Sequence, residues 1–237
     1  MKPRVTPSLE GTAHAAWHDA GVSQTASIAP TPGSFAKRAL DIAVAAVGLT
    51  ILSPVFVSCA ALAKAQSPGS SFFLGYRVGR GGKPFRLIKF RTMVADAPRL
   101  GAAITTADDP RVTPIGRFLR RSKLDEMPNL LNVLFGSMSL VGPRPESADH
   151  VALYSDDDLR LLSIRPGITG PTQILFADEE SLLAAQDDPD AYYETVLLPQ
   201  KVASDLAYVD THTFSGDIAC IVKTLLLVLS RAARRDR

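Results

Sequence analysis

Two adjacent carboxylates, Asp125 and Glu126, are the residues whose types and setting most clearly suggest chemistry. They follow the run GRFLRR, in which three arginines recur at i, i+3 and i+4 of a predicted helix. That spacing lets guanidinium groups converge on one anion, and phosphate is the anion that such a group favours. The arginines are Arg117, Arg120 and Arg121.

The segment Asp125-Glu126-Met127-Pro128 is typical of a helix start, because acidic side chains favour the first turn and proline tolerates it. We therefore expect both carboxylates to be ionised. An ionised Asp125 could hold a metal, act as a base, or attack phosphorus to form an aspartyl phosphate. It could equally cap the helix and pair with an arginine, since Asp is a favoured capping residue. Local spacing leaves these alternatives open.

Five motifs occur along the chain in an order that is far more specific than any one of them. They are KFRTM at residues 89–93, DPRVTPIGRFLRR from Asp109, LDEMPNLLNVL from Leu124, SLVGPRPE from Ser139 and RPGITG at residues 165–170. Together they resemble the bacterial sugar transferases, also called monotopic phosphoglycosyl transferases, over roughly residues 35–229. Members of that family move a phosphosugar from a nucleotide sugar onto polyprenyl phosphate.

The resemblance implies two displacements, with a UDP-sugar as donor and undecaprenyl (polyprenyl) phosphate as acceptor. Asp125 would attack the sugar-bearing β-phosphate and release UMP, and the lipid phosphate would then attack the aspartyl phosphosugar. We expect Mg²⁺ as cofactor, held by Glu126 and phosphate oxygens, because a hard cation reduces the repulsion between the phosphates and the carboxylate. The reaction would initiate the assembly of a polysaccharide or glycoconjugate.

The same motifs supply cations for the substrate phosphates and a loop for the nucleotide side of the donor. Without the resemblance, the cations of KFRTM could mark a solvated strand edge, and the Pro-Arg-Pro segment could be a rigid loop with an exposed arginine. The RPGITG segment is predicted to be a loop whose glycines allow a close approach to a ligand, although a plain turn would use the same residues. The expected phosphate-binding residues are Lys89, Arg91, Arg111, Arg120 and Arg144, and the expected nucleotide-side residues are Pro143, Pro145 and Thr169.

Two other functions fit parts of the pattern. A membrane-anchored nucleotide-sugar-binding or scaffold protein would keep the fold without turnover, with the carboxylates serving only as a cap. Direct transfer in one displacement would use Asp125 as a base for the lipid phosphate and would form no covalent intermediate. Retention of both carboxylates beside the arginines argues against the scaffold function, and direct transfer stays open as an alternative.

Composition narrows the class of protein. The chain has 237 residues and a formal net charge of +2, so it carries no bulk positive charge for nucleic acid. Its two cysteines, Cys59 and Cys220, lie in apolar runs, which predicts neither a disulfide framework nor a zinc site. A homo-oligomer is compatible with this composition.

The first 34 residues are predicted to be a disordered tail, because they are rich in small and polar residues and hold no apolar block. Trp17 and His18 could anchor a partner there, but a solvated tail is the favoured interpretation.

Residues 35–66 are predicted to form a re-entrant membrane helix. The stretch 39–63 holds one charge, Asp41, and is long enough to cross a bilayer. Ser53-Pro54 lies at its middle, where proline kinks a helix, and basic residues flank both ends. A return to the same face places the catalytic domain on the cytoplasmic side of the bacterial inner membrane. A straight single-pass helix and a buried core helix are the alternatives.

Residues 67–237 are predicted to be a small, mostly helical α/β catalytic domain with amphipathic helices at the membrane interface. We expect a hairpin whose second strand covers residues 85–90, a short helix and loop in 94–108, an acidic helix at 154–164 and a last helix at 218–229 capped by Asp217. That last helix ends in an arginine-rich tail suited to anionic lipid.

One segment departs from the family pattern. Many relatives continue after the glycine loop with a Gln-Val-Asn-Gly-Arg type of segment, of which this chain keeps Gln173 and lacks the arginine. The identity of the donor sugar is therefore less defined than the reaction. The acidic stretch 179–193 could form a helical lid or a solvated helix, and Asp205 is expected to lie beside the metal or behind its ligands.

Overall fold

The computed structural model describes residues 34–66, 68–97, 105–106 and 109–233. The predicted tail with Trp17 and His18, most of the predicted short helix in 94–108, and the last four residues lie outside this described part. Within it the chain is mostly helical, with short strands, as the α/β prediction requires.

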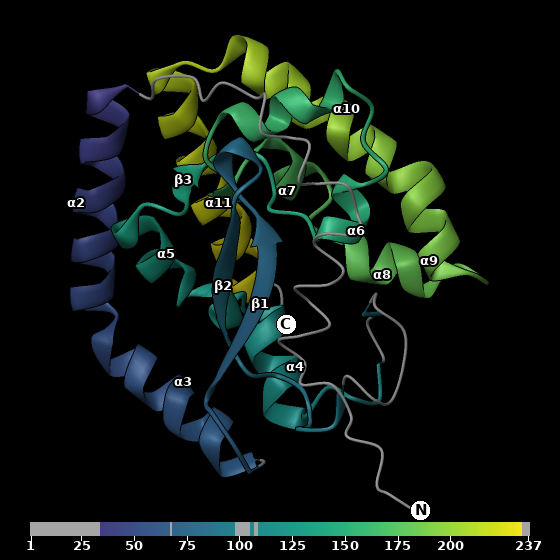
Figure 1. Cartoon of the computed structure of the whole chain (residues 1–237). Coiled ribbons are helices and arrows are strands. Elements are labelled where there is room, and N and C mark those ends of the chain that lie inside the picture. Colours follow the sequence, from purple (N-terminus) through teal and green to yellow (C-terminus); the bar gives the residue numbers. More distant parts are fainter. Residues whose placement is uncertain (1–33, 67, 98–104, 107–108, 234–237) are drawn as a thin grey trace, which may run out of the picture.

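The first two described helices form a bent pair along the left edge of Figure 1. Helix α2 covers Phe35–Ile51 and α3 covers Ser53–Gln66, with a bend of 68° between them. The break falls at Leu52, directly before the predicted Ser53-Pro54, and the Ser53 hydroxyl donates to the carbonyl of Thr50 at 2.8 Å. No single helix of the described part is long and apolar enough to cross a membrane, whereas this bent pair together meets the length and composition required.

Polar side chains fasten α2 to the rest of the domain. The carboxylate of Asp41 is buried and accepts from the Ser139 hydroxyl at 3.1 Å and from the Leu140 amide at 2.9 Å. The Lys37 ammonium pairs with the buried carboxylate of Asp217 at 2.5 Å and donates to the carbonyl of Val141 at 3.0 Å. Because these partners are far apart in sequence, α2 is an integral part of the fold.

Strands in the described part form two small sheets. Strand β1, Phe72–Val78, pairs antiparallel with β2, Pro84–Phe90, so the predicted hairpin is confirmed. Strand β3, Ser139–Val141, pairs in parallel with β4, Gly167–Thr169. The prediction of a loop for RPGITG is therefore wrong over β4. A three-residue segment is too short to show the alternating pattern of a strand, so its pairing with β3 could not be predicted from the local sequence.

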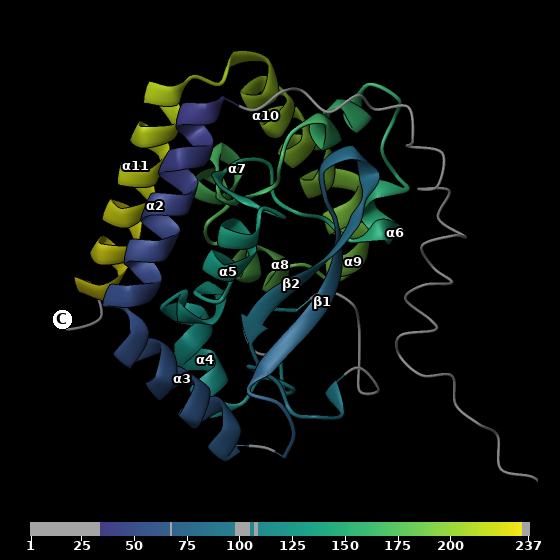
Figure 2. The same ribbon diagram turned by 60° about the vertical axis from the view of Figure 1, so that its left-hand side comes forward.

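Helices surround these sheets (Figures 1 and 2). Helix α5, Asn129–Phe135, lies between α2 and the hairpin and contacts both, and its Val133 belongs with Ala45 of α2 to the main apolar core. The other helical elements of the described residues are η2 Arg80–Gly82, α4 Pro114–Arg121, η4 Leu124–Glu126, α6 Ala148–Val151, η5 Asp158–Ser163, α7 Pro171–Leu175, α8 Glu179–Ala184, α9 Pro189–Tyr192, η6 Tyr193–Leu197, α10 Leu198–Thr211 and α11 Phe214–Ala233.

Two helix predictions need correction. The stretch 154–164 does not form one acidic helix, because Ser155 and Asp158 bond each other and start the separate 3₁₀ helix η5. The last helix begins earlier than predicted, at Phe214, and the Thr213 hydroxyl accepts from the Gly216 amide at 3.1 Å. Asp217 is therefore no cap; it lies in the first turn and binds Lys37 and the Tyr208 hydroxyl.

The contact between Lys37 and Asp217 yields a first prediction. Replacing Lys37→Met leaves a carboxylate that is 2 % exposed without its cation, so the free energy of unfolding should fall by about 3 kcal/mol. Urea unfolding of the detergent-solubilised chain, followed by circular dichroism, measures this. Lys83→Met removes an exposed lysine and is the matched control. Equal stability of the two variants would contradict the importance of this ion pair.

Candidate active site

A tight turn positions the two carboxylates. Helix α4 starts at a capping residue, Thr113, whose hydroxyl accepts from the Gly116 amide at 3.0 Å. After α4, Lys123 adopts a left-handed conformation, with φ of 58°, and turns the chain into the 3₁₀ helix that contains Asp125 and Glu126. A non-glycine residue at positive φ is uncommon and costs conformational energy. Lys123 is thus a residue of the site that sequence reasoning missed.

The carboxylates do not start an α-helix, contrary to the prediction. Helix α5 begins four residues after Asp125, and no side chain caps either η4 or α5. The reason is that the Met127 and Leu130 amides bond carbonyls three residues back, at 3.1 Å each, which winds this segment as a 3₁₀ helix. The interpretation of Asp125 as a helix cap is therefore wrong.

Glu126 is surrounded by cations. Its Oε1 lies 2.6 Å from the Lys89 ammonium and 3.9 Å from the guanidinium of Arg144. Burial alone would raise the pKa of Glu126, but the charges of Lys89, Arg144 and Lys123 outweigh burial and hold this pKa well below its usual range. Glu126 is ionised at neutral pH, as the sequence predicts.

Asp125 has the opposite environment. Its side chain is 8 % exposed, and its Oδ1 has no hydrogen-bond partner within the described residues. Burial, and then the negative charge of Glu126, raise its pKa to about 6, against the lowering effect of Lys89, Lys123 and Arg120. The two carboxylates thus differ in pKa, which the sequence does not predict, and Asp125 is the one with an oxygen that has no partner in the described part.

The Pro-Arg-Pro loop is held from behind by buried polar groups. The Arg144 amide donates to Asp205 at 3.2 Å, and Asp205 also accepts from the Thr172 hydroxyl. Burial raises the pKa of Asp205 to about 6, although both of these hydrogen bonds lower it. Asp205 therefore supports the Arg144 loop through its backbone.

A second network holds Glu146, which follows this loop. Its carboxylate accepts from the Tyr193 hydroxyl at 2.9 Å and lies 3.4 Å from the Lys201 ammonium. Lys201 is 3 % exposed and also pairs with Glu179 at 3.1 Å. Sequence reasoning gave no role to Tyr193, whose local pattern is that of an ordinary helix residue, or to Lys201, although Lys201 lies four residues before Asp205 in the same family-like segment.

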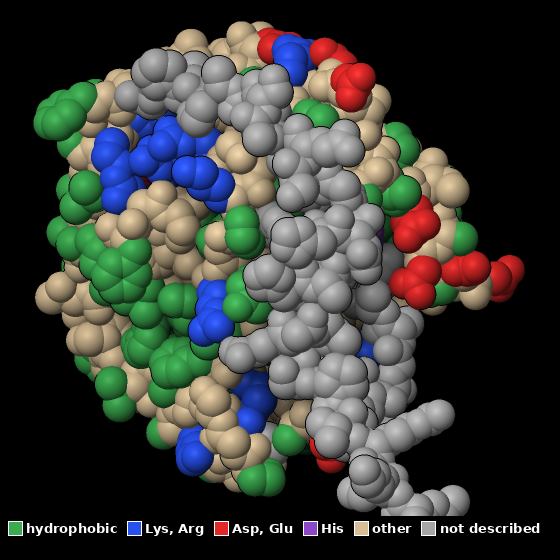
Figure 3. Space-filling view, viewed as in Figure 1, with side chains coloured by type: hydrophobic (Ala, Val, Ile, Leu, Met, Phe, Trp, Pro, Cys, Tyr) green, Lys and Arg blue, Asp and Glu red, His purple; other side chains and the backbone are tan. Residues whose placement is uncertain are grey.

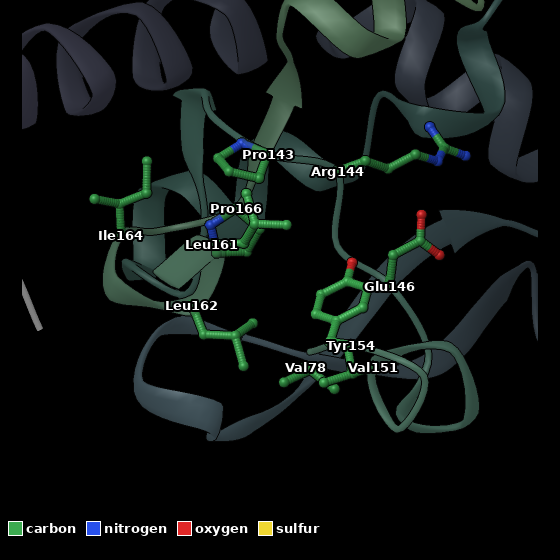
Figure 4. A pocket seen from close by; sticks show the side chains of 11 residues that line it. Val78, Pro143, Arg144, Glu146, Val151, Tyr154, Leu161, Leu162, Ile164 and Pro166 are labelled. Carbon is green, nitrogen blue, oxygen red and sulfur yellow. The ribbon is translucent and has the colours of Figure 1, made fainter. Parts of the chain in front are cut away.

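Figure 4 shows the underside of the same loop. Arg144 and Glu146 help to line a small cavity whose other walls are mainly apolar, and their charged ends extend to one side of it. The cavity holds about 10 Å³, which suffices for one water at most. It is a packing space beneath the loop and no substrate pocket.

Glycines bring the two loops of the site together. A Cβ on Gly142 would lie 2.4 Å from the carbonyl oxygen of Arg165, and one on Gly167 would lie 2.1 Å from the Gly142 amide nitrogen. The predicted close backbone approach therefore exists, but the backbones approach each other. Thr169 faces α11 and shares a 2.6 Å hydrogen bond with Thr224, so its hydroxyl is engaged inside the domain.

The predicted phosphate-binding cations separate into two groups. Lys89 and Arg144 meet at Glu126, and the charge of Arg120 acts on Asp125. Arg111 forms a buried ion pair with Asp109 at 2.6 Å, and Arg91 donates to the carbonyl of Pro68 at 2.9 Å. The structure thus brings three of the five to the carboxylates, and the role of all five in binding phosphate stays a prediction.

The arginines of α4 do not converge. Arg120 donates to the Thr92 hydroxyl at 2.9 Å, whereas Arg117 reaches the carbonyl of Val112 at 3.5 Å and Arg121 is exposed. Arg120 also lies 3.4 Å from Glu180 at the start of α8. The acidic segment 179–193 therefore contacts the site through Glu179 and Glu180, so the first turn of α8 is not fully exposed to solvent.

The residues present are compatible with the predicted Mg²⁺. The described residues contain no cluster of three His, Cys, Asp or Glu side chains able to hold a metal. Mg²⁺ is nevertheless commonly bound through one or two carboxylates together with substrate phosphates and waters. Asp125 and Glu126 supply two such groups, and the unpartnered Oδ1 of Asp125 is an oxygen that a cation could satisfy.

Comparison with known proteins identifies the family. A family model described as bacterial sugar transferase matches residues 32–231. The chain belongs to the bacterial sugar transferase family. The exopolysaccharide production protein ExoY of Rhizobium meliloti is 34% identical to this sugar transferase over 226 residues, which cover 89% of this chain and 92% of ExoY.

Two further relatives carry more specific names. The UDP-glucose:undecaprenyl-phosphate glucose-1-phosphate transferase of Caulobacter vibrioides is 36% identical over 198 residues, covering 82% of this chain and 70% of that protein. The UDP-N-acetylgalactosamine-undecaprenyl-phosphate N-acetylgalactosaminephosphotransferase of Aeromonas hydrophila is 33% identical over 213 residues, covering 88% of this chain. The match spans about half of the Aeromonas protein, 47%. These names support the predicted enzyme class of this sugar transferase, phosphoglycosyl transferase.

The split carboxylate pair predicts stability changes of opposite sign. Asp125→Asn should raise the free energy of unfolding at pH 8 by about 1 to 3 kcal/mol, because it removes a buried charge whose pKa is raised. Glu126→Gln should lower it by about 3 kcal/mol, because Lys89 and Arg144 lose their anion.

The pH dependence of the Asp125→Asn effect follows from linkage. A carboxyl whose folded pKa is raised costs stability only where it ionises, so the difference from wild type should appear between pH 3.8 and about 6 and persist above. Chemical unfolding at pH 4, 6 and 8 measures both variants. If both substitutions changed the free energy of unfolding in the same direction at pH 8, the inferred pKa difference between Asp125 and Glu126 would be refuted.

Proposed function

We propose that this protein transfers a phosphosugar from a UDP-sugar to undecaprenyl phosphate, with release of UMP and an aspartyl-phosphosugar intermediate. Its family supports the reaction class, and the names of the Aeromonas and Caulobacter relatives support the donor and acceptor classes. The relation to ExoY supports a role at the start of exopolysaccharide assembly.

The observation that carries this proposal is the difference between the two carboxylates. Asp125 has an unpartnered Oδ1 and a pKa of about 6, so it is largely ionised and nucleophilic at neutral pH. Glu126 is ion-paired to Lys89, which leaves it less free to attack. A weakly paired carboxylate beside cations is the arrangement that nucleophilic catalysis on a phosphate requires.

The proposed steps balance as two displacements at one phosphorus. An oxygen of Asp125 forms a bond to the β-phosphorus while the bond from phosphorus to the UMP oxygen breaks, and UMP leaves with that electron pair. An oxygen of the lipid phosphate then bonds the same phosphorus, and the bond to Asp125 breaks. Lys89, Arg120 and Arg144 offset the negative charge near the reacting group. Mg²⁺, when bound through Glu126, would neutralise further charge on the phosphates.

The proposed location is the cytoplasmic face of the bacterial inner membrane. Apolar side chains are exposed along the bent pair, including Val47, Ile51 and Val57, and along α11, including Leu225 and Leu226. Figure 3 shows apolar side chains along the left edge, and lysine and arginine side chains gathered near the upper end of α2. An apolar face beside cations fits insertion into an anionic membrane surface. We propose that the bend at Ser53-Pro54 returns the chain to the same face.

Trapping of the intermediate tests the proposal. A panel of UDP-sugars labelled with ³²P at the β-phosphate is incubated with the full chain and Mg²⁺ without acceptor, and the protein is then denatured and counted. Wild type should retain about one label per active site and release equal UMP, and undecaprenyl phosphate should discharge the label. Asp125→Asn should retain none. UMP release that requires acceptor, with unlabelled protein, would favour direct transfer. No UMP from any donor would favour the scaffold function.

The pKa of Asp125 predicts the pH dependence of that step. The rate of UMP release in a single turnover should rise with pH around an apparent pKa of about 6, because the nucleophile must lose its proton. Lys89→Met should move this midpoint upward by roughly one unit, since Lys89 lowers the pKa of Asp125. Lys83→Met on the same hairpin should leave the midpoint in place. A midpoint that Lys89→Met does not move would contradict this assignment.

A further inference from the structure

Arg77, near the end of β1, is a cation to which neither the motifs nor the proposed mechanism gives a task. Residues of a strand point alternately to its two faces, and the neighbouring Val78 is 2 % exposed in an apolar cluster. Arg77 therefore points to the opposite face of the hairpin. Phe73 shares that face, and the strand register places Lys89 directly opposite Phe73. Arg77 and Lys89 thus belong to one face of the hairpin.

The guanidinium of Arg77 is directed back along this face toward the position of Lys89. It donates to the carbonyl of Tyr76 at 2.8 Å. A Cβ on Gly75 would lie 3.6 Å from the Nη1 of Arg77 and 2.9 Å from the ring of Phe73. Because glycine has no side chain, both larger side chains can lie over the strand at this point.

A backbone hydrogen bond brings the Pro-Arg-Pro loop to the same end of β1. The Val78 amide donates to the carbonyl of Glu146 at 3.0 Å, two residues beyond Arg144. The charges of this loop reach Arg77: burial has the largest effect and lowers the pKa of Arg77, Glu146 raises this pKa, and Arg144 lowers it. Arg77 and Arg144 are therefore neighbouring cations.

The negative charge of Glu146 is engaged by other groups. Its carboxylate lies 3.4 Å from the Lys201 ammonium and 3.2 Å from the His150 ring, and it accepts from the Tyr193 hydroxyl at 2.9 Å. Arg77 forms no ion pair with any residue that the structure describes. Two neighbouring guanidinium groups repel each other, and a bound phosphate would relieve this repulsion while accepting bidentate hydrogen bonds.

We propose that Arg77 is a donor-binding residue of this site and that, together with Arg144, it binds the α-phosphate, which leaves with UMP. Lys89 lies at the carboxylates, and Arg77 lies farther along the same face of the hairpin. A diphosphate whose β-phosphate is attacked by Asp125 therefore directs its α-phosphate toward Arg77. This inference rests on the proposed function, because it assigns a phosphate of the same donor.

Calorimetric titration of UMP into the full chain in nanodiscs, in the presence of Mg²⁺, tests this role. Arg77→Met should weaken UMP binding by about tenfold or more, because a charged donor of hydrogen bonds to the phosphate is lost. Arg77→Lys keeps the charge without the planar fork and should recover part of the affinity. Arg86→Met is the matched control: Arg86 lies opposite Tyr76, on the other face of the same hairpin, and UMP affinity should not change.

The melting temperature separates a binding role from a structural one. Arg77→Met removes a cation that lies beside Arg144 without an ion pair, so the protein without nucleotide should melt at or above the wild-type temperature. Saturating UMP should raise the melting temperature of wild type more than that of the variant. A variant that melts lower and keeps the wild-type affinity for UMP would assign Arg77 a structural role and overturn the proposal.

Failure of this inference can be told from failure of the proposed function. Unchanged UMP affinity in Arg77→Met, or no UMP binding by wild type, overturns the role of Arg77 even if the donor labels Asp125. Unchanged UMP affinity with weakened UDP binding would place Arg77 at the β-phosphate and overturn its assignment to the α-phosphate. Weakened UMP binding in Arg77→Met, with Arg86→Met unaffected, supports the proposal even if no label is transferred, in which case the covalent mechanism is the part that fails.

Discussion

The site depends on the repulsion between two adjacent carboxylates that share a buried turn. Two neighbouring negative charges repel each other and so disfavour ionisation of both groups. Burial strengthens this repulsion because the protein interior screens charge less well than water. The chain resolves the conflict asymmetrically: Lys89 and Arg144 lie at Glu126, and Asp125 keeps an oxygen without a partner. A pair with equal partners would give two fixed structural anions, whereas this asymmetry leaves one carboxylate with an unpartnered oxygen and one fixed charge.

Keeping that asymmetry requires rigid placement of the cations. Lys89 lies on β2, whose backbone is held to α5 by Asn132, so the lysine and the carboxylates belong to one packed unit. Arg144 lies on a loop between two prolines, and Asp205 accepts from its amide. Glu146, Tyr193 and Lys201 add a second buried network beside it. Buried polar networks that are well satisfied specify one arrangement, and here they fix the positions on which the pKa difference depends.

The sequence predicts the parts of this arrangement that short-range patterns encode. Proline chemistry predicts the helix break beside Ser53-Pro54, strand composition predicts the hairpin strand that ends at Phe90, and motif order predicts the motif residues of the site. The difference between Asp125 and Glu126 does not, because it arises from burial and from the position of Lys89, 37 residues away along the chain. The pairing of β3 with β4 could not be predicted either, because it also depends on residues far apart in the sequence. A three-residue strand is too short to show a periodic pattern and is defined by its hydrogen bonds to the partner strand.

The same long-range contacts connect the bent helix pair to the chemistry. Asp41 and Lys37 of α2 bond the backbone of β3 at Leu140 and Val141, and β3 leads directly into the loop that carries Arg144. A displacement of α2 would therefore shift the start of this loop, and with it the guanidinium that helps keep the pKa of Glu126 low. Purely apolar packing would let α2 slide along the domain, whereas directional bonds to a strand fix its position along that strand. The position of the bent pair on the domain and the geometry of the carboxylate pair thus depend on one set of buried polar contacts.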